Sequence, residues 1–354
     1  MPRRVSIVAA GRGTPGGQGM QALALHEALR REGHEVSFIP IEATFPRGLR
    51  WVRRLPYART LLNEAIFLPR LLEIRRADVV FVFSAAYWSF LLAPAPAILA
   101  ARALGRRVVL VYHSGEADDH LSRWGTLVHP CLRIAHEIVV PSTYLRDVFA
   151  RHGYTTRVIR NVVDTSRFRF VERSMLRPRL ISTRNLERHY RVDNTIRAFA
   201  ILKKRCPEAT LTVVGSGTEE GRLRRLAASL GADGIRFLGS VPPRAMPALC
   251  DEADLFVNSS EVDNQPVSLL EAFAAGLPVV TTATGGIGAM VRHGETGLLV
   301  PHDDPATMAS ALSSLIESPE RARRMAARAR EEVEEYTWTR VRESWDAVSG
   351  ASAA

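Results

Sequence analysis

Two acidic residues flank a predicted change from loop to helix in the second half of the chain. Asp263 lies in a polar loop after an apolar run, and Glu271 lies inside a helix predicted to begin at Pro266. The free N–H groups and positive potential at a helix start suit a phosphate. At ~1.5 Å per helical residue, the two carboxylates are about 10 Å apart. That spacing fits two hydroxylated groups on either side of a diphosphate better than a shared metal, and a solvent-facing Glu271 is the alternative.

Other predicted strands are also followed by residues that can bind anions. Arg184 and Asn185 follow the first predicted strand of the second half. A guanidinium matches phosphate oxygens with two parallel hydrogen bonds. Gly285 and Gly286 follow a later strand, and their amides could add to an anion nest. A purely structural turn explains each of these sites equally well when it is taken by itself.

Residues 112–120 form a loop that is rich in ionisable side chains. Three interpretations stay open: a metal site, a histidine beside a reacting centre, and a solvated loop. The candidate metal ligands are His113, Glu116, Asp118 and His120.

A glycine-rich loop, residues 11–19, separates the first predicted strand from the first predicted helix. Its glycines would let the backbone approach a ligand closely, and a flexible turn without a ligand is the alternative. No Gly-Lys-Ser/Thr follows the glycines of this loop. The loop therefore does not fit a Walker A motif.

The elements that position these loops alternate between strand and helix, twice over. Short, nearly continuous apolar strands separated by helices indicate parallel sheets covered on both faces. We expect an α/β fold with two doubly wound, Rossmann-like domains whose ligand loops follow the strands. The predicted strands are 5–9, 34–40, 77–83, 107–113, 137–140, 179–183, 210–214, 235–238, 254–258 and 277–282. The predicted helices are 19–31, 192–204, 219–230, 266–275 and two or three within 305–345.

The 354 residues exceed what one core usually supports, so two domains are expected. We assign residues 1–165 to an N-terminal domain on the acceptor side and 166–178, which is polar and rich in arginine, to a linker. Residues 179–335 form the second domain, and a helix within 336–354 is expected to pack back towards the first.

The formal net charge of +10 lies in the first half of the chain, because residues 1–176 hold 25 Lys and Arg against 14 Asp and Glu. We find no nucleic-acid-binding signature, so a nucleic-acid partner is not expected. Residues 45–76 mix arginines with aromatic and aliphatic residues around a predicted amphipathic helix. This favours a face for an anionic membrane surface, with an ordinary core helix as the alternative.

No transmembrane stretch or signal peptide is evident, and the three cysteines are isolated. We therefore expect a cytoplasmic protein, with the inner face of the membrane as a further location. Neither a disulfide framework nor a cysteine zinc site is expected.

The motifs, in this order, resemble a retaining GT-B glycosyltransferase of family 4. The resemblance covers most of the chain and is strongest from about residue 179 to 301. It rests on the glycine loop before "QALALHEALRREGHEV", on "HSG" and on "RNVVD". It rests further on "VVGSGTEEGRLRRLA", "IRFLGSV", "LLEAFAAGLPVVTTATGGI" and "HGETGLLV".

The resemblance implies transfer of a sugar from a nucleoside diphosphate sugar, with no cofactor and no required metal. It implies a catalytic set of His113, Asp263 and Arg184, with His113 near the transferred sugar and Asp263 on its hydroxyls. Glu271 would bind the donor ribose. The implied donor-binding residues are Gly17, Arg184, Asn185, Gly215, Leu238, Asn264, Gln265, Pro266, Val267, Ser268, Glu271, Gly285 and Gly286.

The sequence departs from the family pattern at three positions. Asp263 stands where a glutamate is usual, and Tyr190 stands where a phosphate-binding lysine is usual. Arg188 or Arg191 could replace the lost charge. The usual glutamate after Gly-Gly-Ile is replaced near Ala289. These departures bear on donor affinity and on which sugar is carried.

The expected function is a retaining glycosyltransferase acting on a carbohydrate or lipid-linked acceptor in cell-envelope, polysaccharide or glycolipid assembly. Two alternatives stay open. One is an epimerase or hydrolase of the same fold acting on the donor without an acceptor. The other is a non-catalytic protein that binds anionic glycans or nucleic acid, which would explain the charge but not the loops.

Overall fold

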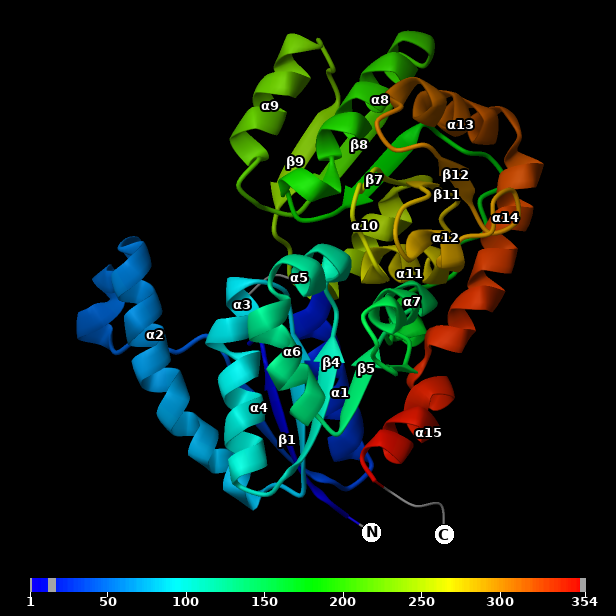
Figure 1. The fold of residues 1–354 in the computed structure, drawn as a ribbon. Helices are drawn as coiled ribbons and strands as arrows, with labels where there is room; N and C mark the ends of the chain where they lie inside the picture. The colour runs from blue at the N-terminus through cyan, green and yellow to red at the C-terminus, as the bar shows by residue number, and fades with distance from the viewer. Residues whose placement is uncertain (1, 12–16, 351–354) are drawn as a thin grey trace. The chain divides into compact units, whose positions relative to one another are not determined.

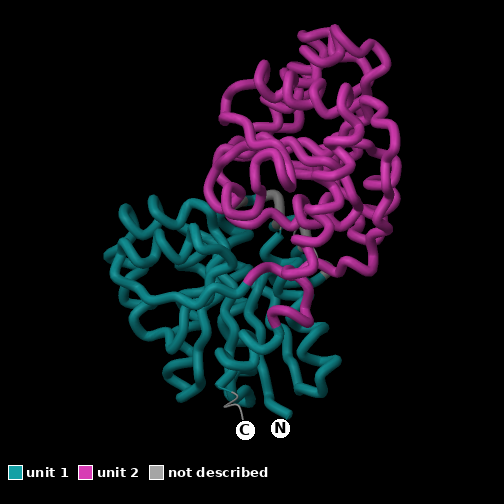
Figure 2. The backbone as a smooth tube through the Cα atoms, turned by 90° about the vertical axis from the view of Figure 1, so that its right-hand side faces the viewer, with its two compact units in different colours: residues 1–159, 342–354 teal, residues 160–341 magenta. Residues whose placement is uncertain are grey.

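The computed structural model describes residues 2–11 and 17–350, which form two compact units (Figure 1). Figure 2 colours unit 1, residues 1–159 and 342–354, and unit 2, residues 160–341. Each unit contains a six-stranded sheet in which every strand pairing is parallel. The expectation of two doubly wound α/β domains is thus confirmed. Most of the predicted glycine loop, residues 12–16, lies outside the described residues.

The sheet of unit 1 has the strand order β2-β1-β3-β4-β5-β6. Its central strands read as runs of Val, Phe and Leu, because helices cover both faces of a parallel sheet. All six residues of β3 are buried. The strands are β1 (Arg4–Ala9), β2 (Glu35–Pro40), β3 (Val79–Ser84), β4 (Arg107–Tyr112), β5 (Glu137–Val140) and β6 (Arg157–Val158).

The helices of unit 1 follow the strands in turn. Phe67, Phe90 and Phe149 bring three of these helices into one apolar core with β3 and β4. The helices are α1 (Gly17–Arg31), η1 (Arg47–Arg54), α2 (Pro56–Arg70), η2 (Leu71–Arg76), α3 (Trp88–Leu92), α4 (Pro94–Ala103), α5 (Ala117–Arg123), α6 (Gly125–Ile134) and α7 (Thr143–Arg151). Among the helices of residues 2–11 and 17–350, none combines the length and apolar composition that crossing a bilayer requires.

The sheet of unit 2 has the strand order β12-β11-β10-β7-β8-β9. The chain builds outward from β7 in one direction and then, from β10, in the other. The carboxyl ends of β7 and β10 therefore flank the point where the strand order reverses, which is where such sheets bind ligands. The strands are β7 (Arg179–Thr183), β8 (Thr210–Val214), β9 (Ile235–Gly239), β10 (Leu255–Asn258), β11 (Val279–Thr282) and β12 (Leu298–Val300).

The helices of unit 2 cover both faces of its sheet. Phe199 of α8 lies in one apolar cluster and Phe273 of α11 lies in the other. The helices are η3 (Thr165–Arg167), η4 (Arg188–Tyr190), α8 (Val192–Arg205), α9 (Glu220–Ser229), η5 (Pro243–Ala245), α10 (Met246–Glu252), α11 (Val267–Ala274), α12 (Ile287–Met290), α13 (Pro305–Glu317), α14 (Pro319–Val333) and η6 (Glu334–Tyr336).

The last described residues, 342–350, belong to unit 1, and α15 (Trp338–Val348) carries the chain there. The indole of Trp345 packs edge-on against Phe81 of β3, with 5.4 Å between ring centroids. The Nε–H of Arg107 donates to the carbonyl of Val348 at 3.0 Å.

The arginine-rich stretch expected to be a linker, 166–178, lies within unit 2 and is fastened to it by Arg173. This side chain is only 6% exposed and lies 3.7 Å from Asp254. A buried guanidinium is tolerated only when its donors are bonded. Its N–H groups donate to the carbonyls of Val171, Cys250, Ala253, Ala275 and Gly276.

Replacing Arg173 should destabilise unit 2. Arg173→Leu leaves five carbonyls without this donor and removes a cation beside Asp254, at an expected cost of about 3–5 kcal/mol. Arg169→Leu is the matched control, because Arg169 is 75% exposed and 3.7 Å from Asp251. Urea unfolding followed by circular dichroism measures both variants. Equal losses would contradict the role given to Arg173.

Candidate active site

The candidate site of unit 2 is built on the loops after β7 and β10. Arg184 directly follows β7, so its backbone position is set by the pairing of that strand. Residues 259–266 follow β10 and lead into α11. The sequence analysis named Arg184 and Asp263 in these loops and Ser268 in the helix that follows, and the structure brings the three side chains together.

Arg184 and Asp263 form a nearly buried ion pair. Arg184 Nη2 and Asp263 Oδ2 are 2.6 Å apart, and each side chain is 10% exposed. The Nη1–H of Arg184 also donates to Ser268 Oγ at 3.4 Å. Arg184 Nε is buried and has no hydrogen-bond partner among the residues that the structure describes. A buried cation with an unused N–H is costly, and such groups gather at binding sites.

Tyr190, which stands where the resemblance implies a lysine, packs against the same guanidinium. The ring centroid lies 4.0 Å from Arg184 Cζ, within cation–π range. Tyr190 therefore restricts Arg184 without adding a charge. Arg191 does not replace the lysine, because its guanidinium is paired with Asp193 and Asp303. Arg188 is exposed.

The glycines of the site allow backbone segments to approach each other closely. A Cβ on Gly285, which has φ +52°, would lie 1.9 Å from the carbonyl oxygen of Asp263. A Cβ on Gly286 would lie 2.1 Å from that of Asn264. The N–H of Gly286 donates to the carbonyl of Asp263 at 3.2 Å. This amide, predicted for an anion nest, instead holds the Asp263 loop.

Gly215, directly after β8, allows a similarly close approach to the loop after β7. It has φ +134°, and a Cβ there would lie 2.0 Å from the carbonyl oxygen of Arg184. The N–H of Arg184 in turn donates to the carbonyl of Val214 at 3.0 Å. Small residues at the ends of β8 and β11 thus set the positions of Arg184 and Asp263.

A buried hydroxyl network supports the loop after β10 and was not singled out from the sequence. The hydroxyls of Thr282 and Thr284 donate to the carbonyl of Ser260 at 2.6 and 2.8 Å. The Ser260 hydroxyl donates to Asn258 Oδ1 at 2.8 Å. The available signal was a group of Ser, Thr and Asn at the ends of neighbouring predicted strands.

The start of α11 differs in detail from the prediction. Pro266 has ψ 120° and caps the helix, which begins at Val267. The Gln265 side chain accepts from the N–H of Asn161 at 2.5 Å, and its carbonyl accepts from the Asn161 amide at 2.8 Å. Gln265 is therefore engaged with the segment before η3, while Asn264 is buried beside it.

Glu271 lies inside α11, on the helix that begins at this loop. Burial raises the pKa of its carboxyl to about 7, and the positive charge of Arg167 acts in the opposite direction. An unusual proton affinity in a half-buried carboxyl is typical of a functional group. Of the other predicted donor residues, Gly17 begins α1, Asn185 is half-buried directly after Arg184, and Leu238 is 39% exposed on β9.

In unit 1, His113 follows β4 and stacks on Phe83 of β3, with ring centroids 5.5 Å apart. The other residues of its loop do not gather around it as metal ligands. Asp118 lies 3.2 Å from Arg151 and 3.1 Å from His152. His120 is fully buried, and its Nδ1 lies 2.8 Å from the Tyr112 hydroxyl.

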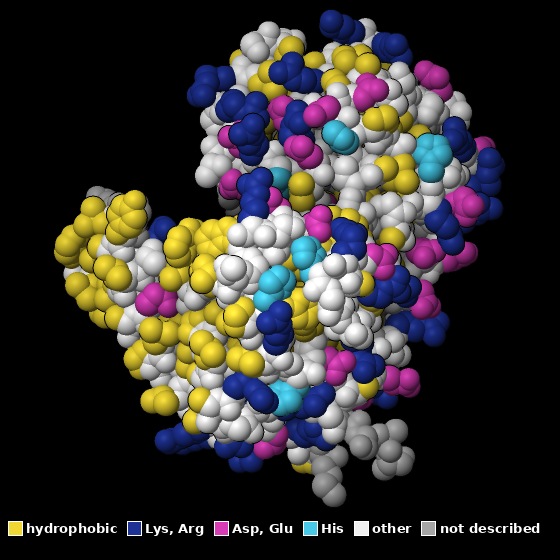
Figure 3. All heavy atoms as spheres, in the orientation of Figure 1, with side chains coloured by type: hydrophobic (Ala, Val, Ile, Leu, Met, Phe, Trp, Pro, Cys, Tyr) yellow, Lys and Arg dark blue, Asp and Glu magenta, His cyan; other side chains and the backbone are white. Residues whose placement is uncertain are grey.

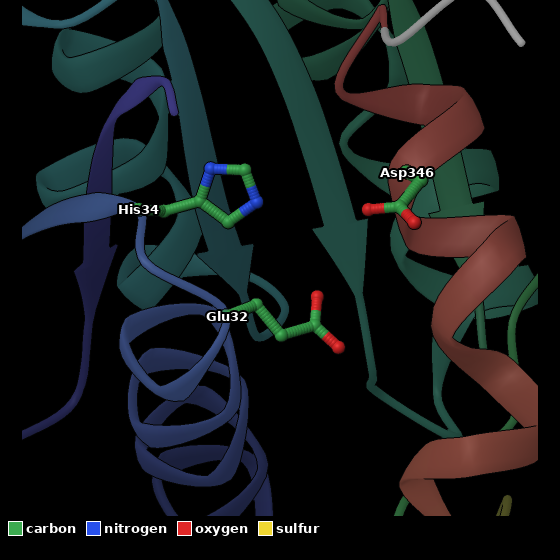
Figure 4. A group of neighbouring side chains, drawn as sticks. All are labelled: Glu32, His34 and Asp346. Atoms are coloured by element: carbon green, nitrogen blue, oxygen red, sulfur yellow. The ribbon is translucent and has the colours of Figure 1, made fainter. Parts of the chain in front are cut away.

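Glu32, His34 and Asp346 form a different group, whose ligand atoms lie within 4.8 Å of one another. Figure 4 shows the side chains of Glu32 and His34, from the turn between α1 and β2, near that of Asp346 from α15. The N–H of Arg3 donates to His34 Nδ1 at 3.2 Å, which assigns the proton of a neutral ring to Nε2. A protonated Nε2 is no metal ligand, so we make no metal proposal for this group.

Comparison with known families agrees with this geometry. The family model described as "Glycosyl transferases group 1" matches residues 164–332, and the model described as "Glycosyltransferase Family 4" matches residues 15–167. Together they span both sheets. The chain belongs to this glycosyltransferase family.

Curated relatives of this glycosyltransferase chain include the "Glycogen synthase" of Mycobacterium tuberculosis, 32% identical over 243 residues, or 65% of the chain and 58% of that protein. A second is the "GDP-mannose-dependent alpha-(1-6)-phosphatidylinositol monomannoside mannosyltransferase" of Mycolicibacterium smegmatis. It is 30% identical over 254 residues, 66% of each protein. The match thus spans about three fifths to two thirds of the relatives' own length.

Solved structures confirm the GT-B fold. HepE from Anabaena, in complex with UDP-glucose, superposes with a TM-score of 0.78 at 18% identity, over 98% of this chain and 100% of that one. Sucrose-phosphate synthase from Thermosynechococcus elongatus gives a TM-score of 0.76 at 19% identity, over 99% and 100%.

The raised pKa of Glu271 predicts a pH-dependent loss of stability. Between the ordinary carboxyl value of 4.5 and about 7, the unfolded chain ionises Glu271 while the folded glycosyltransferase keeps it protonated. Stability should therefore fall as pH rises through this window and level off above it. The measurement is the melting temperature between pH 4.5 and 8. Glu271→Gln should remove the part of its decrease that comes from ionisation of Glu271. A variant with the same pH profile as the wild-type protein would contradict the assignment.

Proposed function

We propose that this chain transfers a sugar from a nucleoside diphosphate sugar to a hydroxyl acceptor, with retention of anomeric configuration. The observation that carries the proposal is the nearly buried Arg184, whose Nε is without a partner among the described residues, beside the start of α11. An arginine and a helix start together suit a diphosphate. The family membership of the chain and its resemblance to retaining enzymes also support the proposal.

Arg184 and the first turn of α11 would stabilise the leaving diphosphate. Negative charge grows on the diphosphate as its bond to the sugar breaks, and fixed donors at that position lower the barrier. Arg184 donates from Nε and Nη1 in this proposal. Positive charge from these protein groups takes the role that a metal ion would otherwise have, so we propose a reaction without a required metal.

Asp263 and Glu271 would accept hydrogen bonds from hydroxyls on either side of the diphosphate, Asp263 from the sugar and Glu271 from the ribose. His113, at the carboxyl end of β4, is proposed to contact the transferred sugar. The bond from the acceptor oxygen to the anomeric carbon forms on the face from which the diphosphate departs. The acceptor proton passes to a diphosphate oxygen, so no protein base is needed.

The names of relatives support the donor and acceptor classes. One relative is named for GDP-mannose and phosphatidylinositol monomannoside. Another, from Corynebacterium efficiens, is a "D-inositol 3-phosphate glycosyltransferase" and is 37% identical over 150 residues. We propose a nucleoside diphosphate hexose as donor and a carbohydrate or lipid-linked acceptor of cell-envelope or polysaccharide assembly.

Arg184→Ala should lower the turnover of the nucleoside diphosphate sugar by about 10²–10³-fold. Loss of one hydrogen-bond donor that stabilises a developing oxyanion has an effect of this size. Arg224→Ala is the control, because Arg224 is half exposed on α9 and pairs with Glu220. The measurement is release of nucleoside diphosphate from a panel of UDP, GDP and ADP sugars, with and without added acceptors. Unchanged turnover in Arg184→Ala would overturn the site.

The same assay separates the alternative activities. Release that rises with an acceptor supports transfer. If free sugar forms at a rate that no acceptor raises, the activity is hydrolysis instead of transfer. If an epimer of the donor forms in this way, the activity is epimerisation.

A further inference from the structure

Helix α2 has apolar residues on two sides, of which one is internal. Ala58, Leu62 and Ile66 pack against a small cluster of Ala43, Phe45 and Val52. Phe67 is buried in the main core of unit 1. These contacts account for the fixed position of α2 and leave its other side uncovered.

The uncovered side of α2 is a continuous apolar stripe. Tyr57, Leu61, Ala65 and Leu68 follow one another at intervals of four, four and three residues, which places them within an arc of about 80°. Tyr57 is 88% exposed and Leu61 is 72% exposed. Leu72, just beyond the helix, is 62% exposed. We call these five residues the outer stripe.

The apolar surface continues into the segment before α2. Trp51 of η1 is 61% exposed and Leu55, between the two helices, is 47% exposed. Figure 3 shows hydrophobic side chains gathered at the position of α2 on this face of the molecule. Large contiguous apolar surfaces are uncommon on soluble proteins and mark sites of association.

The chain that carries the outer stripe is mainly positive in charge. Residues 43–63 contain five arginines and no aspartate or glutamate. Further along, Glu73 is 3.2 Å from Arg70. Glu64 is half-buried, and burial raises the pKa of its carboxyl. A positively charged segment that carries exposed Trp, Tyr and Leu side chains is typical of contact with the interface of an anionic bilayer.

A second copy of the chain fits this surface poorly. A symmetric dimer formed through the outer stripe would bring two such arginine-rich segments together, and like charges across an interface oppose association. We propose that the outer stripe, with Trp51 and Leu55, is a docking surface for an anionic phospholipid membrane. The leucines would enter the acyl boundary, and the positive charge of the segment would be attracted to the anionic headgroups. The proposal goes beyond glycosyl transfer and does not depend on it.

The test is co-sedimentation of the full chain with phosphatidylcholine vesicles, with and without phosphatidylglycerol. The wild-type protein should bind the anionic vesicles at low salt and lose most binding at high salt. The double variant Leu61→Ser with Leu68→Ser should bind at least about tenfold more weakly. Leu127→Ser with Leu230→Ser is the matched control, because these leucines are 55% and 38% exposed, in α6 and directly after α9. The control should bind as the wild-type protein does.

Three outcomes would overturn the proposal. One is absence of wild-type binding to anionic vesicles at low salt, and another is equal binding by the stripe variant. The third is that sedimentation velocity shows the wild-type protein as a dimer and the stripe variant as a monomer, while neither binds vesicles. The outer stripe would then contact a second copy of the chain. Vesicle binding is measured without a sugar donor, so it does not depend on turnover. Membrane docking and glycosyl transfer can therefore be contradicted independently.

Discussion

The account depends on one electrostatic constraint: a guanidinium held almost out of water at the point where the strand order of unit 2 reverses. Arg184 is kept there by a carboxylate on one side and an aromatic ring on the other. Removing an arginine from water is costly, and one ion pair rarely repays that cost in stability. A buried Nε without a partner among the described residues adds to it. The arrangement is explained best by an anion that completes it.

The surrounding fold keeps this cation in place. Strand β7 sets the backbone of Arg184, and glycines at the ends of β8 and β11 let neighbouring carbonyls approach within distances that a side chain would forbid. Hydroxyls of Ser260, Thr282 and Thr284 fix the loop that carries Asp263. Because these supports are buried and hydrogen-bonded, the site is largely formed before any ligand arrives, which lowers the entropy cost of binding.

Much of the fold could be predicted because it follows from local patterns. Apolar runs bounded by glycine or polar residues predicted β5, β7 and β8 with the bounds that the structure has. Strands β6 and β12 were missed because two or three residues carry no measurable periodicity. The 166–178 stretch looked like a linker because composition counts Arg173 as polar, whereas its donors are all turned to buried carbonyls. The Arg184–Tyr190 contact could not be predicted, because it depends on how the chain folds back between β7 and α8. The Gly285–Asp263 contact could not be predicted either, because it depends on the exact approach of two backbone segments.

The central claim, that a diphosphate completes the buried guanidinium of Arg184, is tested most directly by calorimetric titration of UDP, GDP and ADP into the wild-type protein and Asp263→Asn. The substitution removes the carboxylate that competes with the diphosphate for the guanidinium, and it also removes a repelling charge. The account predicts that the preferred nucleoside diphosphate binds the variant about tenfold more tightly, equivalent to about 1.4 kcal/mol. Equal or weaker binding by a folded Asp263→Asn variant would contradict it.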